Sequence, residues 1–183
     1  MTIDARLNET RALEGGAILR PIRISDDPAI ARVIRTVMTD LGAVGKGFSI
    51  QDPEVDRMSA AYSGDKAMYF VIDQGGQVLG GAGVGPLPEA DDDVCELKKM
   101  YMLRDGRGRG YGKALLDRCL EAARRLGYRR CYLETLTTMR EARKLYEKNG
   151  FHRIDAPMGA TGHFGCNVWY LCNVSPTSDL TPY

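Results

Sequence analysis

Arg107-Gly108-Arg109-Gly110-Tyr111-Gly112-Lys113 is the most informative segment of this chain. It joins a predicted strand over residues 94–102 to a predicted helix over residues 110–126. Glycines let backbone N–H groups approach a ligand closely, and a helix N-terminus attracts anions through its free N–H groups and its dipole. Because arginine and lysine add positive charge here, the segment predicts a phosphate or pyrophosphate site. The alternative is an ordinary strand-to-helix loop whose glycines serve geometry alone.

Two well-known phosphate loops do not fit this segment. A P-loop needs a serine or threonine after Gly-Lys, but Ala114 follows Gly112-Lys113. A dinucleotide fingerprint, G-x-G-x-x-G, has no glycine at its sixth position from any start here, and the segment follows several strands instead of the first. The arrangement that does fit is R-x-x-G-x-G, as Arg107, Gly110 and Gly112.

Hydrophobic periodicity predicts an α/β (α+β) fold with a mixed sheet. Ser25-Asp26-Asp27-Pro28 indicates a helix start with a cap and two acids for the dipole, and a second helix is expected over residues 52–62. The strand–helix–strand order of 94–102, 110–126 and 130–136 implies one parallel pair, whereas short turns make the early strands antiparallel. Strands are predicted over 17–22, 67–72, 77–84, 94–102, 131–136, 151–154 and 167–173.

Length and composition favour one domain over residues 17–174, with flexible segments at 1–16 and 175–183. The chain has 183 residues and a net charge of +1, which gives no indication of nucleic-acid or membrane binding. No stretch is long and apolar enough for a membrane span, and the N-terminus does not read as a signal peptide. The five cysteines form no C-x-x-C pair and the histidines do not stand at zinc-finger spacing. We therefore expect free thiols, no metal and a cytoplasmic protein.

Several motifs together resemble the GNAT family of N-acetyltransferases. Besides the R-x-x-G-x-G turn, residues 96–102 resemble the strand that leads into it, and residues 142–151 match the family's A-x-x-L-Y-x-x-x-G-F helix. Arg20-Pro21-Ile22-Arg23, followed by Asp26 or Asp27, resembles the usual opening. The resemblance runs from about residue 17 to 174. It implies the GNAT fold, a mostly antiparallel sheet flanked by helices, with its parallel strand pair splayed around the cofactor.

The resemblance also implies acetyl-CoA as cosubstrate, with its pyrophosphate on the glycine-rich turn. The residues carried over as cofactor-binding are Met100, Tyr101, Met102, Arg107, Gly108, Arg109, Gly110, Tyr111, Gly112, Lys113 and Tyr146. One departure concerns an asparagine that many members place three residues before the helix alanine, since this chain has Met139 there. No asparagine contact is therefore carried over.

The family chemistry is direct attack of an amine on the thioester, through a tetrahedral intermediate. It implies a general base, backbone oxyanion donors from the strand near Met100–Met102, and a proton donor for the thiolate. Tyr146 matches the family's tyrosine acid, and Glu96 matches a carboxylate used as base in part of the family. Ion-paired Glu96, the pair Glu134-Thr135, and His163 stay open alternatives for the site. Cys166 is not expected to be a nucleophile, because direct transfer needs no covalent step.

The acceptor side of this fold corresponds to about residues 38–62 and 156–168, with Gly42–Gly47 as a candidate lid. We expect a small-molecule amine or an amino acid, while a peptide N-terminus, a lysine and a hydroxyl acceptor stay open. Acetyl is the family's default acyl group. The alternative function is a non-catalytic acyl-CoA-binding sensor or regulatory module. Family members are often dimers, so a homodimer is one option.

Overall fold

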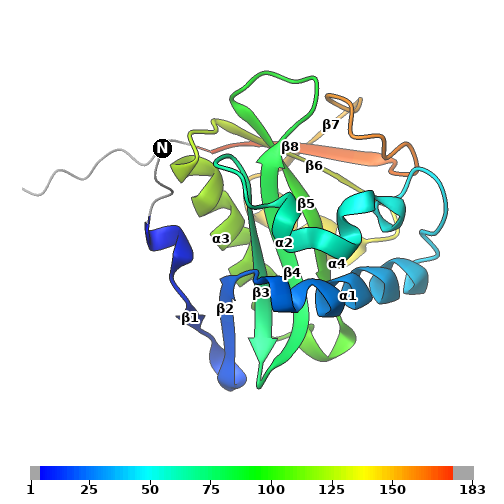
Figure 1. The fold of residues 1–183 in the computed structure, drawn as a ribbon. Coiled ribbons are helices and arrows are strands. Elements are labelled where there is room, and N and C mark those ends of the chain that lie inside the picture. The colour runs from blue at the N-terminus through cyan, green and yellow to red at the C-terminus, as the bar shows by residue number, and fades with distance from the viewer. Residues whose placement is uncertain (1–4, 175–183) are drawn as a thin grey trace, which may run out of the picture.

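A computed structural model describes residues 5–174, and its centre is one 8-stranded sheet. Its strands lie in the order β1 (Arg11–Ala12), β2 (Ala17–Pro21), β3 (Met68–Gln74), β4 (Gln77–Pro86), β5 (Val94–Met102), β6 (Arg130–Thr135), β8 (Val168–Asn173) and β7 (His152–Ile154). The helices are α1 (Asp27–Asp40), α2 (Met58–Ala61), α3 (Tyr111–Arg125) and α4 (Arg140–Lys148) (Figure 1). Short 3-10 turns stand at Ala5–Asn8, Glu14–Gly16, Ile24–Asp26, Ser49–Gln51, Pro53–Arg57 and Arg104–Gly106.

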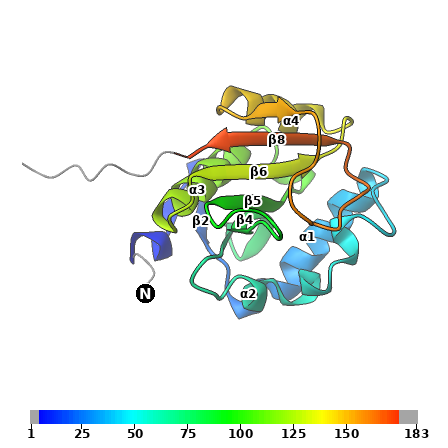
Figure 2. The same ribbon diagram turned by 90° about the horizontal axis from the view of Figure 1, so that it is seen from above.

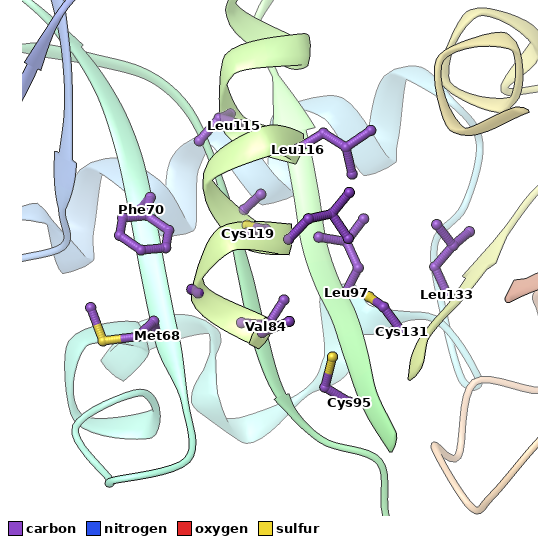
Figure 3. Packing of buried hydrophobic residues seen from close by; sticks show 14 of the residues in the cluster. Met68, Phe70, Val84, Cys95, Leu97, Leu115, Leu116, Cys119, Cys131 and Leu133 are labelled. Atoms are coloured by element: carbon purple, nitrogen blue, oxygen red, sulfur yellow. The ribbon is translucent and has the colours of Figure 1, made fainter. Parts of the chain in front are cut away.

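The helices cover both faces of the sheet. Successive strand residues point to opposite faces, so each face presents apolar side chains to the helices that pack on it. On β3, Phe70 and Ile72 join the cluster beneath α3 and α4, whereas Tyr69 and Val71 join the cluster beneath α1 and α2. Figure 3 shows the first cluster, in which leucines of α3 stand over β3, β4 and β5. The two apolar layers hold the central strands rigidly between them.

The predicted mixed sheet is confirmed, and its parallel pair is β5 with β6. Only three residue pairs join these strands, ending at Glu96 opposite Tyr132. β6 continues to pair with β8 as far as Thr135, and β5 continues to pair with β4 as far as Met102. Beyond Glu96 the two neighbours therefore separate and leave an opening in the middle of the sheet.

The predicted start of α1 is at the right place, but its two acids bond side chains and backbone of neighbouring elements. Asp26 is buried and bonds the Arg20 guanidinium at 2.6 and 2.9 Å, and Asp27 accepts from the backbone and hydroxyl of Ser59. The two acids join α1 to β2 and to α2 instead of only complementing the helix dipole. The predicted helix over 52–62 is split into a 3-10 turn and the single turn of α2, since Arg57 leaves helical geometry.

Asp26→Asn should lower the free energy of unfolding by about 2 kcal/mol, because it removes a charged acceptor of two hydrogen bonds from buried Arg20 and leaves Asp73 as the counterion. Burial raises the pKa of Asp26, but hydrogen bonds from Arg20 and from the Arg23 amide outweigh burial and hold it below 3.8. The wild type should therefore keep this stability above pH 3.8 and lose it as the pH falls further. Urea unfolding from pH 3 to 7 measures both effects. A variant with the same acid slope as the wild type would contradict this role of Asp26.

The segment before residue 17 packs against the domain over its described part. Leu7 is buried, and the buried Arg118 of α3 donates to the carbonyls of Arg6, Leu7 and Glu9. The expected flexibility of 1–16 therefore does not extend over these residues. Residues 17–174 stay our proposed extent of the domain, and the predicted tail at 175–183 lies outside the described residues.

Candidate active site

The N-terminus of α3 exposes backbone donors. Gly108 and Gly110 have φ of 73° and 77°, a region that favours glycine, and a Cβ at either would meet nothing within 4 Å. The Ala114 amide bonds the Gly110 carbonyl, so the amides of residues 111–113 precede the first helical bond. The first turn of α3 carries no acidic residue. These features fit a pyrophosphate, which needs amide donors and positive charge.

The side chains of this turn have different partners, and not all of them face the anion site. Arg107 donates its Nε to the Met102 carbonyl at 2.9 Å, which fixes the turn to the end of β5. Tyr111 is buried and donates its hydroxyl to the Glu14 carbonyl at 2.7 Å, so only its backbone belongs to the anion site. Lys113 bonds Asp117 one turn further along α3, and Arg109 borders a hollow with Glu14, Gly15 and Gly108.

The opening between β5 and β6 forms a cleft. One wall comes from residues 96–101 of β5, residues 133–136 in and after β6, Met139 just before α4, and Tyr146 on α4. The other wall, on the side of α1, comes from Met38, Phe48, Ser49, His163 and Cys166. Met100 connects this cleft to the glycine-rich turn, because its methyl group lies near Gly112. The predicted anion site thus lies next to the cleft that holds the predicted catalytic side chains.

A bulge in β5 shapes the wall of the cleft. The register with β4 shifts between Gly81 and Gly83, and Lys99 has a φ of +49°. Tyr69 donates its hydroxyl to the Lys99 carbonyl at 2.9 Å, which holds the irregular backbone in place. A bulge leaves residues out of the regular ladder. Of the three residues predicted to serve the cofactor here, Met100 and Tyr101 line the cleft, whereas Met102 packs its side chain over Gly80 and Gly106.

Tyr146 reaches the cleft from α4. It is 4% exposed, and its ring packs against Phe151 and Tyr170 at centroid distances of 5.8 and 6.3 Å. Its hydroxyl makes no hydrogen bond within residues 5–174. Burial raises the pKa of Tyr146 above its ordinary value, which keeps the phenol protonated. The position suits a proton donor.

Glu96 stands where β5 and β6 part. The residue is 4% exposed, and burial raises the pKa of its carboxyl above 4.5 although Lys98 opposes the shift. The Lys98 ammonium lies 3.4 Å from one carboxylate oxygen, so the ion-paired interpretation of Glu96 holds in part. A carboxyl with a raised pKa is better able to take a proton from an ammonium.

His163 joins two distant parts of the cleft. Its Nε2 lies 3.0 Å from Asp52, and its Nδ1 lies 3.8 Å from Glu134 on β6. Burial lowers the pKa of His163, but the hydrogen bond and charge of Asp52 outweigh burial and the net shift is upward. Asp52 also accepts from the buried Lys99 ammonium at 2.6 Å. Sequence reasoning did not single out Asp52, because nothing local shows a partner 111 residues away.

Two further residues that the sequence analysis named, Cys166 and Met139, lie at the cleft. Cys166 lines the cleft, and burial raises the pKa of its thiol to about 12, which disfavours a thiolate nucleophile. Met139 also lines the cleft, and its sulfur accepts from the Thr135 hydroxyl at 3.4 Å. Thr135 thus faces the site as a neighbour of Met139, and Glu134 faces it as a neighbour of His163.

The candidate lid is tied to the loop between β7 and β8, which crosses toward α1 (Figure 2). Gly165 donates its amide to the Gly47 carbonyl at 3.0 Å. The ring of Phe164 lies directly on Gly47, and the ring of Phe48 lies on Gly165. The two acceptor-side segments predicted from the sequence therefore close the same end of the cleft. Within residues 5–174 no helix could span a membrane, and no three metal-ligating side chains gather around one point.

Comparison with known proteins agrees with this geometry. The Acetyltransferase (GNAT) family matches residues 36–151. An N-acetyltransferase of Escherichia coli K12, YjgM, whose function is uncharacterized, is 43% identical over 155 residues, which cover 84% of this chain and 93% of that protein.

Solved structures share the fold at low identity. A GNAT acetyltransferase of Staphylococcus aureus superposes with a TM-score of 0.77 at 20% identity, over 87% of this chain and 99% of the other. YncA of Salmonella typhimurium, solved with acetyl-CoA, gives a TM-score of 0.71 at 18% identity, over 90% and 97%. The family match and the E. coli relative confirm the resemblance found in the sequence: the chain belongs to the GNAT family and is an N-acetyltransferase.

Proposed function

We propose that this enzyme transfers the acetyl group of acetyl-CoA to the amine of a small molecule by direct attack. One observation carries the proposal most strongly. The separation of β5 and β6 beyond Glu96 places a buried carboxylate, an irregular strand backbone and the Tyr146 hydroxyl around one cleft. These are the base, the oxyanion donors and the acid that acyl transfer to an amine requires.

The anion site on α3 supports acetyl-CoA as the cosubstrate. The amides of residues 108–113 and the positive side chains of the turn would hold its pyrophosphate, and Met100 connects this turn to the cleft. Acetyl-CoA supplies the activated acyl group. The chain's own contribution is to position the acyl group and the amine, and to move protons between them.

Glu96 fits the role of base better than its neighbours do. The His163 Nε2 atom is engaged by Asp52, and both oxygens of Glu134 already accept hydrogen bonds from Tyr132 and Thr161. Glu96 instead makes one direct ion pair, with Lys98, and burial raises its pKa although Lys98 and His163 oppose the shift. It would take a proton from the entering ammonium, because only the neutral amine has a lone pair for attack.

The backbone at the β5 bulge would stabilise the oxyanion. Residues 99 and 100 lie where the register with β4 shifts, so their amides are not all committed to the ladder. Tyr146 would then protonate the departing thiolate. The buried cleft, closed by Phe48 and the loop that carries His163, favours a small molecule over a folded protein as acceptor.

The experiment that tests the function measures thiol release from acetyl-CoA with a panel of amines, amino acids, peptides and hydroxyl compounds. Calorimetry first establishes that the protein binds acetyl-CoA. We expect turnover with small primary amines. Cofactor binding without thiol release from any acceptor would contradict the proposal and favour a non-catalytic acyl-CoA-binding role.

Gly108→Asp should weaken acetyl-CoA binding by at least tenfold relative to Gly108→Asn. Both side chains enter open space and both adopt the same left-handed backbone, with φ of 73°. They differ in one negative charge, which would face the pyrophosphate at the N-terminus of α3; about 1.4 kcal/mol corresponds to tenfold in affinity. Calorimetry with CoA measures the difference. Equal affinities would show that the pyrophosphate binds elsewhere.

A further inference from the structure

Glu134 is a buried carboxylate without a hydrogen-bonded cation. Its side chain is 5% exposed at the wall of the cleft. One oxygen accepts from the Tyr132 hydroxyl at 2.7 Å and the other from the Thr161 hydroxyl at 3.0 Å. Both donors are neutral. The His163 Nδ1 lies 3.8 Å away, while the other ring nitrogen contacts Asp52 at 3.0 Å.

The cations that line the cleft are already engaged with carboxylates. The Lys99 ammonium, 2% exposed, bonds Asp52 and Glu54 at 2.6 and 2.7 Å. The Lys98 ammonium lies 3.4 Å from Glu96. Apart from these two lysines and His163, no basic side chain among the described residues lines the cleft. An acceptor with its own carboxylate would find no available counterion there, and burying an unpaired charge is costly.

Glu134 and Glu96 present their carboxylates to the same side of the sheet. Glu96 stands opposite Tyr132 in the parallel register, and Glu134 follows two residues after Tyr132 on the same face. The remaining wall is largely apolar, with Met38, Phe48, Leu136 and Met139. Two carboxylates and an apolar wall are complementary to a cation on an apolar body.

We propose that Glu134 selects the acceptor, and that the acceptor is a primary amine on an apolar or aromatic body without a carboxylate group. This inference rests on the proposed function and narrows its substrate class. Glu134 attracts the ammonium, and Glu96 removes one proton. As the C–N bond forms and the C–S bond breaks, Tyr146 protonates the thiolate and regains a proton from the second N–H of the amine. The products are the amide and CoA thiol, and Glu96 returns one proton to water.

Matched pairs of amines and their parent amino acids test the substrate class directly. Phenethylamine with phenylalanine, and tyramine with tyrosine, differ only in the carboxylate. We expect kcat/KM for each amine to exceed that of its amino acid by at least about tenfold, since an unpaired buried carboxylate costs more than 1.4 kcal/mol. Equal values, or a preference for the amino acids, would overturn the inference and leave the proposed function intact.

Glu134→Gln tests the residue itself. It keeps the size of the side chain and an oxygen for Tyr132 but removes the charge. We expect kcat/KM for phenethylamine to fall by about 10- to 100-fold, with KM for acetyl-CoA unchanged and the low rate with phenylalanine unchanged. The matched control is Glu141→Gln, which removes a charge from a side chain that is 85% exposed on α4 and should keep wild-type rates.

The outcomes distinguish a failure of the role of Glu134 from a failure of the proposed function. A Glu134→Gln enzyme that keeps the wild-type amine rate, or that loses amine and amino acid rates equally, would overturn the role of Glu134. If this variant does not fold, the ranking of matched pairs by the wild type decides the inference alone. No thiol release from any amine or amino acid, on protein that binds acetyl-CoA, would overturn the proposed function. Calorimetry would then compare the affinities of the wild type for phenethylamine and phenylalanine, and tighter binding of the amine would support the inference.

Discussion

Tyr146→Phe should lower kcat by about 100- to 1000-fold while KM for acetyl-CoA changes by less than about threefold. The substitution removes only the hydroxyl, which is the atom we assign to protonate the thiolate. The ring keeps its contacts with Phe151 and Tyr170, and the hydroxyl has no hydrogen bond within the described chain, so stability should be unchanged. Steady-state kinetics and thermal unfolding of the variant measure the two quantities.

Tyr128→Phe is the matched control for that prediction. Tyr128 is equally buried, and its hydroxyl donates to the Lys66 carbonyl at 2.8 Å, outside the cleft. The control should lose about 1 kcal/mol of stability and keep kcat. Tyr146→Phe should therefore lose activity without losing stability, and Tyr128→Phe should lose stability without losing activity. If Tyr146→Phe turns over as fast as the wild type, Tyr146 has no acid role and serves only packing.

Glu96→Gln should lower kcat/KM by about 100-fold or more and change the pH profile. In the wild type the base must be ionised, so the rate falls as the pH falls through the pKa of Glu96. Since burial raises that pKa above the ordinary 4.5, the acid limb should lie at a higher pH than for an exposed glutamate. The variant should lack this limb. Kinetics from pH 5 to 9 give both results.

The exposed Glu141→Gln variant again provides the control, and it should keep the wild-type limb. A Glu96→Gln variant with the same acid limb as the wild type would assign the base to another group. His163 is the nearest alternative, and its removal in His163→Gln would then abolish the limb. These measurements decide between Glu96 and His163, two of the alternatives that the sequence left open.

Local patterns were sufficient to predict most strands and helices of this fold. β3, β4, β5 and β6 follow from apolar runs between turn residues, and α3 follows from its apolar stripe. The parallel pair follows from the helix between its strands. The two-residue β1 and the docking of Leu7 were not predictable, because a polar segment gives no sign that Arg118 is buried 111 residues away.

The site was predictable only where its residues stand in a local motif. The glycine-rich turn and Tyr146 belong to contiguous motifs, and Glu96 stands on the strand that leads into the turn. Asp52, Lys99 and His163 become one ionic cluster only through the fold, with Glu134 of β6 3.8 Å from the His163 ring. The structural role of Asp26 likewise needed Arg20 from the neighbouring strand, where the sequence showed only a helix start.

The docking of residues 6–9 on α3 has a consequence for synthesis on the ribosome. The Arg118 guanidinium holds the carbonyl of Arg6, a residue made 112 positions earlier. While the chain is being translated, β1 can pair with β2 early, but the carbonyls of Arg6, Leu7 and Glu9 lack the Arg118 guanidinium until α3 has emerged and packed on the strands. Contacts of such wide separation form late, because the intervening chain must be ordered first. The earliest residues of this stretch to be synthesised are therefore among the last to reach their native contacts.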